Sequence, residues 1–306
     1  MKTLNLSLIA LIAIVFSTAC KKDRNIDSSA GKLSVTEFNQ KYSIPTQNFT
    51  GVAGTAFSIT GAKGIKVDFP ANAFLDANGN PVTGNVKVTL KEVMSKKDIL
   101  LSGKMTESNK QILISGGELQ ILAFQGTQAL KLNLASDVIV KVPTTLSTAP
   151  MDLFTFGGTT VSDSTWMFNQ KARITTTPSY YQFSLPGFGW LNCDYFFSNP
   201  DPKTTITASP AYAGASPSIK EQRAYLLFDN INSVITLPFE VSVNKHQSYL
   251  NSIPLGMTGK LVIISVDMND KIYFGNVSFT VTSGLHLNVP VVLADQSTID
   301  AFLATL

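Results

Sequence analysis

Alternation of apolar and polar residues constrains the fold of this chain more than any other feature. In GIKVDFP (residues 64–70), isoleucine, valine and phenylalanine alternate with lysine and aspartate. In NVKVTLKEV (residues 85–93), valine and leucine alternate with lysine and threonine. A period of two places successive side chains on opposite faces of a strand, so both segments predict half-buried β-strands. The pair Asn78-Gly79 between them predicts a tight turn.

The same β-pattern extends over most of the chain. A further strand is predicted in GELQILAFQ (residues 117–125), and similar segments follow it. Residues 199–222 are rich in proline, serine and small residues, which predicts a domain boundary there. We therefore predict an all-β fold with two antiparallel β-sandwich-like domains, at residues 49–145 and 203–306, joined by a connecting β-segment at 146–198.

Two short helices are expected at the ends of this β-structure. In the last twelve residues, DQSTIDAFLATL, apolar residues recur at i, i+3, i+4 and i+7, namely Ile299, Phe302, Leu303 and Leu306. This spacing predicts an amphipathic helix that covers one face of a sandwich. Near the other end, Ser34 and Glu37 have the spacing of a capping box. The remainder of residues 20–48 is polar, so we expect this segment to be a flexible tether.

The first residues have the layout of a secretory signal. Lys2 precedes an apolar run at residues 4–16, and the small residues Ser17, Thr18 and Ala19 follow it. The run is shorter than the roughly 20 apolar residues that cross a bilayer. We therefore expect residues 1–19 to be a signal peptide whose removal leaves Cys20 as the new N-terminus.

The residues around Cys20 resemble the lipobox of bacterial lipoproteins, although Ser17 stands where that box prefers leucine. The resemblance implies that Cys20 is the lipid-attachment site and carries fatty acids such as palmitate. The lysine at position 21, rather than an aspartate, implies sorting to the outer membrane, and the sequence leaves open which side the domains face. The alternative is a plainly secreted protein whose first residue is cysteine.

Part of the β-pattern also resembles a known module. The segment GAKGIKVDFPANAFLDANGNPVTGNVKVTLKEV, with the later DILLSGKMT and ISGGELQILAF, resembles the ZU5-like module of Bacteroidetes-type lipoproteins. The resemblance covers residues 49–145 and implies a β-sandwich. Some animal relatives of this module cleave themselves at a His-Phe-Ser site. No histidine precedes His246 in this chain, so that activity is not implied.

Composition and the chemically active residues argue against several classes of function. Charged residues make up 15% of the chain and the formal net charge is +3, with no basic stripe, so we expect no nucleic-acid partner. His246 and His286 lack a neighbouring nucleophile motif, and we expect them to lie on the surface or to fill strands. Two histidines and Cys193 are poor material for a zinc site. We therefore predict no catalytic residues, no metal and no cofactor.

Cys193 is predicted to be buried. In WLNCDYF, alternation places Leu191, Cys193 and Tyr195 on one face of a strand. Cysteine is among the most frequently buried residue types, and a lipid-bearing Cys20 leaves Cys193 without a partner for a disulfide. We therefore expect a free, structural thiol.

Two further surface features are expected from short patterns. Asp163-Ser164-Thr165 resembles the acceptor of periplasmic O-glycosylation in Bacteroidetes-type bacteria, which implies a glycan at Ser164 in an exposed loop. Trp166 and Trp190, with neighbouring tyrosines, could stack on a sugar. The alternative is that these aromatic side chains fill the sandwich core, and we favour it because strands are rich in aromatic residues in any case.

Together these features predict a non-enzymatic, lipid-anchored lipoprotein of the cell envelope that acts as a binding or assembly module. Its expected partners are the membrane, through the lipid, and an envelope protein or a glycan. Two alternatives stay open: a carbohydrate-binding accessory lipoprotein, and a hydrolase with an unrecognised site. Fold class does not choose among them, because β-sandwiches host many functions.

Overall fold

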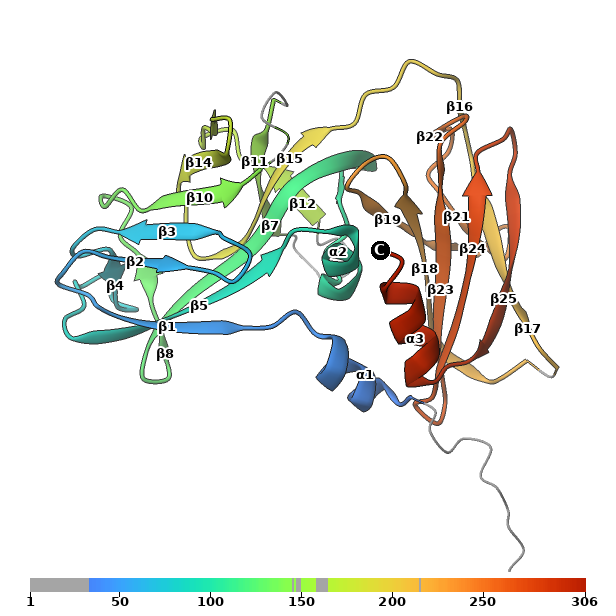
Figure 1. Ribbon diagram of the computed structural model, residues 1–306, viewed down its shortest axis with the longest axis horizontal. Coiled ribbons are helices and arrows are strands. Elements are labelled where there is room, and N and C mark those ends of the chain that lie inside the picture. The colour runs from blue at the N-terminus through green and yellow to red at the C-terminus, as the bar shows by residue number, and fades with distance from the viewer. Residues whose placement is uncertain (1–32, 145, 147–149, 158–164, 215) are drawn as a thin grey trace, which may run out of the picture. The chain divides into compact units, whose positions relative to one another are not determined.

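The computed structural model describes residues 33–144, 146, 150–157, 165–214 and 216–306, and residues 32–306 form one compact unit. The described chain consists mainly of β-strands with three short helices, which confirms the predicted all-β class (Figure 1). The strands form two groups. We call them the N-terminal sandwich, residues 47–196, and the C-terminal sheet, residues 203–293.

The N-terminal sandwich contains two packed sheets. The first has the strand order β1 (Gln47–Val52), β5 (Asn85–Val93), β7 (Gln111–Gln125), β15 (Gly189–Phe196), β11 (Asp152–Gly157) and β12 (Thr165–Phe168), with β6 (Glu107–Ser108) and β8 (Gln128–Ala129) also paired to β7. The second has the order β13 (Thr175–Thr176), β14 (Tyr180–Ser184), β10 (Ile139–Pro143), β3 (Lys66–Phe69) and β2 (Phe57–Thr60). A small separate pair joins β4 (Phe74–Leu75) to β9 (Lys131–Leu132).

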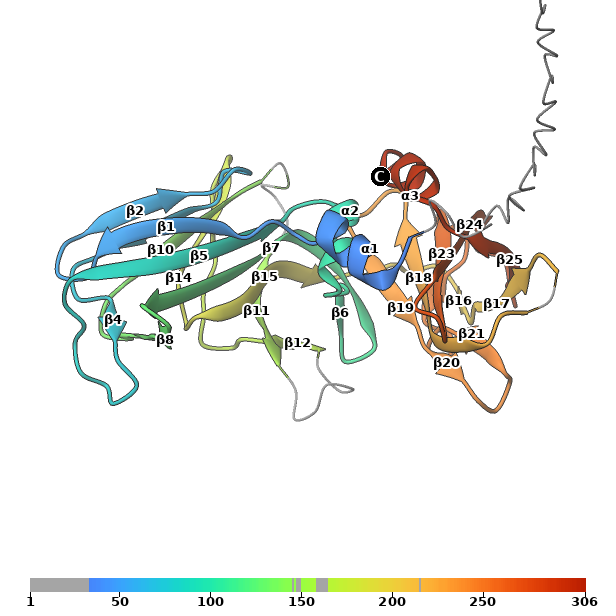
Figure 2. The same cartoon turned by 90° about the horizontal axis from the view of Figure 1, so that it is seen from below.

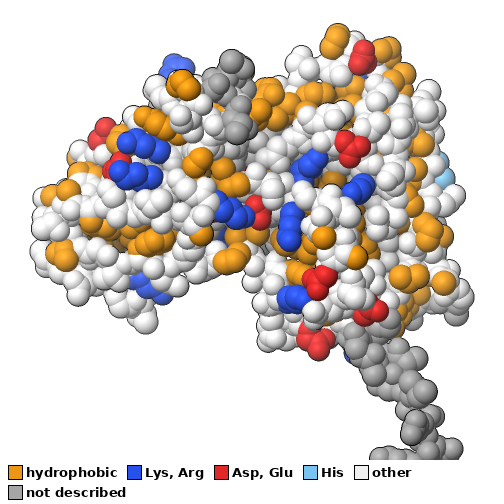
Figure 3. Space-filling model, viewed as in Figure 1, with side chains coloured by type: hydrophobic (Ala, Val, Ile, Leu, Met, Phe, Trp, Pro, Cys, Tyr) orange, Lys and Arg blue, Asp and Glu red, His pale blue; other side chains and the backbone are white. Residues whose placement is uncertain are grey.

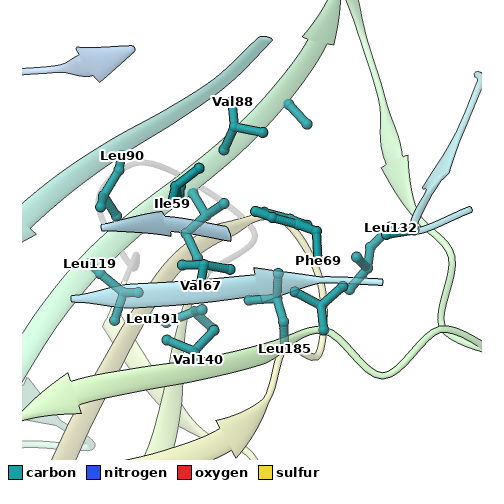
Figure 4. Close-up of a cluster of buried hydrophobic side chains, with 14 of the residues drawn as sticks. Ile59, Val67, Phe69, Val88, Leu90, Leu119, Leu132, Val140, Leu185 and Leu191 are labelled. Carbon is teal, nitrogen blue, oxygen red and sulfur yellow. The ribbon is translucent and has the colours of Figure 1, made fainter. Parts of the chain in front are cut away.

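The apolar faces of these two sheets form the first core. Figure 4 shows side chains from both sheets meeting there, such as Val67 and Val140 from one sheet and Leu90 and Leu119 from the other. All four are fully buried. The alternation that predicted the strands at 64–70 and 85–93 therefore points its apolar residues into this core.

The predicted connecting segment at 146–198 is not a separate connector. Its strands β11, β12 and β15 extend the first sheet, and β13 and β14 extend the second. Strand β15 lies between β7 and β11, so the first sheet would end at an open edge of β7 without it. The boundary at residue 145 was wrong because a sheet is completed by strands that lie far apart in the sequence.

The C-terminal sheet has eight strands in the order β19 (Val234–Leu237), β18 (Ile219–Phe228), β23 (Thr258–Asp267), β24 (Ile272–Thr280), β25 (His286–Leu293), β17 (Thr207–Tyr212), β21 (Lys245–Gln247) and β20 (Phe239–Glu240). Its neighbours are antiparallel except for β17 and β25, which are parallel. A two-stranded pair, β16 (Lys203–Thr204) with β22 (Ile253–Pro254), accompanies it. Its apolar side chains form a second core that includes Leu226, Leu261 and Val289.

Both predicted helices are present. Helix α1 (Val35–Tyr42) begins with the predicted capping box, in which Ser34 and Glu37 bond each other's backbone N–H groups. Helix α3 (Gln296–Leu303) buries Ile299, Phe302 and Leu303, as its apolar spacing predicts. It lies across one face of the C-terminal sheet (Figures 1 and 2).

Helix α2 (Lys96–Ser102) was not predicted. Ser95 and Asp98 form a capping box at its start, and Gly103 ends it in the left-handed conformation with φ of 69°. Its apolar residues Ile99 and Leu100 join α1, α3 and one face of the C-terminal sheet in a third apolar cluster. The sequence did contain a signal for this helix, namely the capping residues Ser95 and Gly103. The seven residues between them are too few to show a helical period.

The predicted flexible tether is shorter than expected. Leu33, Tyr42 and Ile44 are buried, and Leu33 exchanges backbone hydrogen bonds with Ala294 and Ile272. Residues 33–48 therefore belong to the folded unit. The polar composition suggested a flexible segment. Three apolar side chains, Leu33, Tyr42 and Ile44, are nevertheless buried against the folded unit. Residues 20–32 lie outside the described chain.

Candidate functional site

The predicted site residues fall into two groups. Cys20 and Ser164 lie outside the described residues, so lipid attachment and glycosylation stay predictions. Trp166 and Trp190 are described. Trp166 has no exposed surface, packs edge-on against Phe156 and clusters with Phe154. It does not offer a face to a ligand, so Trp166 fills the core, as the favoured alternative predicted, and does not stack on a sugar. Trp166 lies on the short strand β12, which pairs with β11, and its indole packs against side chains of the first sheet.

Trp190 is half-buried between two apolar clusters. The Lys104 ammonium lies 5.9 Å from its ring centroid and 4.1 Å from that of Phe156. Such cation–π contacts hold a lysine among aromatic side chains. The side chain of Trp190 thus helps to fill the interior, in agreement with the core-filling alternative.

Cys193 is buried and free, as predicted. It lies in the first core with Leu191, and Tyr195 packs against the same core. Burial, and secondarily the neighbouring Asp194, raise the pKa of the thiol well above its ordinary value. Because the thiolate is the reactive form, this cysteine is chemically quiet.

On the other face of β15 lies a cluster of buried polar side chains that the sequence did not reveal. Ser115, Glu118, Asn192 and Asp194 have at most 1% of their surface exposed. Ser115 donates a hydrogen bond to Asn192 Oδ1 at 2.9 Å, and Asn192 Nδ2 donates to Asp194 Oδ2 at 2.6 Å. We call these four residues the polar cluster.

An irregularity in the strand pairing assembles the polar cluster. Asp194 lies opposite Ser115 and Asn192 lies opposite Glu118, so β7 spans the gap with one residue more than β15. Such a bulge turns Ser115 and Glu118 to the same face, whereas strict alternation would separate them. Gly117 occupies the bulge with φ of 141°, a conformation that residues with a side chain rarely adopt.

The electrostatics of the polar cluster are unusual. Three oxygen atoms of the cluster have no hydrogen-bond partner among the described residues. They are both carboxyl oxygens of Glu118 and Oδ1 of Asp194. Burial, followed by the Asp194 carboxyl, raises the pKa of Glu118 well above its ordinary value, and Lys104 acts in the opposite direction. Burial likewise raises the pKa of Asp194. The ionised forms are therefore disfavoured, and the pair retains protons that exposed carboxyls lose.

A cavity adjoins the polar cluster. It has a volume of about 510 Å³, and Ser115 and Gly116 from β7 line one side of it. Tyr195, Asn230 and Asn232 contribute an aromatic ring and two amides to its wall. Asn232 also donates a hydrogen bond to the Ser115 carbonyl at 2.9 Å. This combination of a ring with amides and hydroxyls suits a polyhydroxylated ligand.

The two histidines take structural positions. His246 is buried on β21, with Nδ1 at 2.8 Å from the Leu237 carbonyl and Nε2 at 2.9 Å from Gln222 Oε1. Burial lowers its pKa. His286 Nδ1 lies 2.9 Å from the Thr207 hydroxyl. His246 therefore fills a strand, which is one of the two roles predicted for it.

The clearest exposed feature is a segment at one edge of the C-terminal sheet. It comprises β20, β21 and the turns around them, residues 239–250, and we call it the edge segment (Figure 2). Five large apolar side chains are exposed within it: Phe239 (49%), Val241 (81%), Val243 (44%), Tyr249 (37%) and Leu250 (76%). The other exposed large apolar side chains are spread over the rest of the described chain.

Strand β20 ends the sheet, so its outer backbone groups pair with no strand of the described chain. Sequence reasoning missed the edge segment because VSVNKHQ alternates like any strand, and nothing local distinguishes an edge from a centre.

Comparison with known proteins returned nothing: no family model, no curated protein and no solved structure matches this chain. Within the described residues, no group of three or more histidine, cysteine or carboxylate side chains could hold a metal ion. No helix in the same part of the chain is long and apolar enough to span a bilayer.

Proposed function

We propose that this protein is a non-enzymatic, lipid-anchored lipoprotein of the cell envelope, which acts as a binding or assembly module through the edge segment. The resemblance of residues around Cys20 to a lipobox supports the anchor at the outer membrane. The resemblance of residues 49–145 to a ZU5-like module supports the envelope setting. The anchor holds the folded unit at the membrane, and the edge segment contacts an envelope protein.

The exposure of the edge segment carries the proposal. Val241 and Leu250 are 81% and 76% exposed, so most of the surface of both aliphatic side chains lies in water. Several exposed apolar side chains on one short segment of a folded protein indicate an interaction site. The open backbone of β20 beside it can pair with a strand of the partner, a common mode of peptide recognition.

The edge segment and its surroundings carry charges of both signs, which favours a partner that also carries both. Glu240 and Lys245 lie opposite each other in the hairpin, and Lys110 lies 5.3 Å from the Tyr249 ring centroid. Figure 3 shows the opposite face, on which helix α3 lies, and basic and acidic side chains are interspersed there too. Neither observation favours a polyanion such as nucleic acid, which requires clustered lysine and arginine.

The buried carboxyls support a non-enzymatic role. Glu118 and Asp194 have the most strongly raised carboxyl pKa values, which is typical of acid–base residues. Both side chains are fully buried, however, and a general acid must approach its substrate to hydrogen-bond distance. Titration of these two carboxyls therefore affects the stability of the fold, and neither carboxyl can pass a proton to a substrate.

The anchor is tested by metabolic labelling with a fatty acid. Wild-type protein is expected to incorporate the label and to partition into detergent, and Cys20→Ala to lose both. Cys193→Ala is the matched control, because its thiol is buried and should not affect labelling. Unlabelled wild-type protein, or label that persists in Cys20→Ala, would contradict the anchor.

A carbohydrate-binding role is the second candidate, and the cavity beside the polar cluster favours it. Tyr195 would stack on a sugar ring, and Asn230 would bond its hydroxyls. Under this alternative, titration with envelope polysaccharide shows saturable binding that Tyr195→Ala weakens and that Val241→Ser leaves unchanged. Under the leading proposal, the polysaccharide does not bind.

A further inference from the structure

A second cavity lies between the three helices and the C-terminal sheet. Its volume is about 360 Å³. Helices α1, α2 and α3 cover it, and strands β18, β23 and β24 form its floor (Figure 1). We call it the three-helix cavity. Segments from both ends of the chain and from its middle enclose it, so it exists only in the complete fold.

Alternation along β18 supplies the floor. Ala224, Leu226 and Phe228 point into the core of the C-terminal sheet. The odd-numbered residues of the same strand alternate with these and point to the helices, and three of them line the cavity: Glu221, Arg223 and Tyr225. The strand therefore places an arginine and a tyrosine, two residues apart, along a space that is lined mainly by apolar side chains.

The walls of the cavity are buried apolar side chains. Leu100 from α2, Phe274 from β24 and Phe302 from α3 are at most 9% exposed, and the two phenylalanine rings lie 5.0 Å apart. The space exceeds the roughly 150 Å³ of an apolar cavity that accepts benzene. It also falls within the range of about 300–1,000 Å³ typical of small-molecule sites, which combine apolar walls with a few polar groups.

The two charged lining side chains, Arg223 and Glu221, are more than half exposed, and we call this exposed side the mouth of the cavity. Arg223 Nε donates to Glu221 Oε1 at 2.6 Å, which orients the guanidinium, and the arginine side chain is still 61% exposed. Burial raises the pKa of Tyr225 while Arg223 acts in the opposite direction, which indicates that the guanidinium and the phenol are neighbours. An arginine and a tyrosine together can bind a carboxylate with several donors.

We propose that the three-helix cavity binds the alkyl chain of one fatty acid, with the carboxylate of the fatty acid at Arg223. The apolar walls exclude a polar ligand from the interior, because burying its groups without partners is costly. The single arginine at the mouth selects an anionic end. The carboxylate of Glu221 competes for the same guanidinium and limits the affinity.

Dodecanoate and dodecanol test the proposal as ligands of equal chain length that differ in charge. The protein is the full chain carrying Cys20→Ala, so that no covalently attached acyl chain competes. Isothermal titration is expected to show one site for dodecanoate. Arg223→Gln should weaken dodecanoate about tenfold, the loss of one charge-assisted contact, and should leave dodecanol unchanged. Glu221→Gln should tighten dodecanoate.

Ile264→Phe tests the location, because Ile264 lines the cavity and a larger side chain fills it. It should weaken both ligands while the melting temperature shows that the protein folds. Absence of dodecanoate binding to the parent chain would overturn the proposal. Equal affinity of the parent and Arg223→Gln for dodecanoate would do the same, and that variant alters an exposed side chain whose loss should not prevent folding.

Discussion

At the scale of single residues, the carboxyls of Glu118 and Asp194 are the most unusual groups in the molecule. Folding removes both from water and gives Glu118 no hydrogen-bond partner among the described residues. Burial also raises the pKa of Glu107 to about 7, although the Thr236 backbone N–H donates to it at 3.1 Å. The folded chain thus retains protons that the unfolded chain releases near pH 4.

The pH dependence of stability follows from this. A carboxyl whose pKa is raised by folding binds more protons in the folded than in the unfolded chain, so the free energy of unfolding falls as pH rises. For Glu107 the fall extends from the ordinary pKa of glutamate, about 4.3, to about 7. The lowered pKa of His246 acts in the opposite direction, but it is one group against the three carboxyls of Glu107, Glu118 and Asp194. Urea unfolding should therefore show lower stability at pH 8 than at pH 5.

Glu118→Gln should reduce that difference, because the amide cannot ionise. Glu221→Gln, which alters a carboxyl that is 52% exposed, is the matched control and should leave the difference unchanged. Equal pH dependence of wild type and Glu118→Gln would show that the Glu118 carboxyl does not resist ionisation in the folded chain.

The bulge makes a second prediction at this scale. A Cβ atom at Gly117 would lie 2.9 Å from Met94 Sδ and 3.0 Å from Val142 Cγ1, in addition to the strained φ. Gly117→Ala should therefore cost about 1–3 kcal/mol of unfolding free energy. Gly187→Ala is the control, since a Cβ there meets nothing within 4 Å. Similar unfolding midpoints for the two variants would contradict this account of the bulge.

At the scale of elements, alternation and capping predict what local sequence can determine. The strands at 64–70 and 85–93 and the helices α1 and α3 were predicted from spacing alone. The bulge was not, because the residue opposite Gly117 is known only once β7 and β15 are paired. The polar cluster could not be predicted for the same reason. Alternation in WLNCDYF separates Asn192 and Asp194 from Cys193, but it does not show that β7 brings Ser115 and Glu118 to them.

Helix α1 depends on its cap more than on propensity, because it has only eight residues and one buried side chain, Tyr42. Ser34→Ala removes the hydroxyl that accepts from the Glu37 N–H, and should lower the unfolding free energy by about 1 kcal/mol. Ser43→Ala, at the other end of the same helix, is the control. Faster amide exchange should appear in α1 of Ser34→Ala alone, and equal exchange in both variants would contradict the role of the cap.

At the scale of the whole molecule, the N-terminal sandwich and the C-terminal sheet share one packed unit. The Thr106 hydroxyl lies 2.9 Å from that of Ser233, and Lys96 Nζ donates to the Phe228 carbonyl at 2.6 Å. Val93 and Ile99 join the same apolar cluster as residues of the C-terminal sheet. Sequence alone did not predict this junction, because its contacts join residues more than 100 positions apart.

The same junction covers two surfaces that could otherwise take part in binding. The outer face of β7 and β15 and the helical face of the C-terminal sheet are both covered within the folded unit. Strand β20 and its turns keep their apolar side chains in water. The proposed module therefore carries its contact surface at a sheet edge, while the lipid anchor is proposed at Cys20.

Crosslinking in intact cells tests this proposal most directly. A photoreactive amino acid is placed at Val241 in the edge segment or, as the control, at Met268, which is 66% exposed in the turn between β23 and β24. The account predicts a discrete adduct with an envelope protein from position 241 and none from position 268. No adduct from position 241, or the same adducts from both positions, would contradict binding through the edge segment.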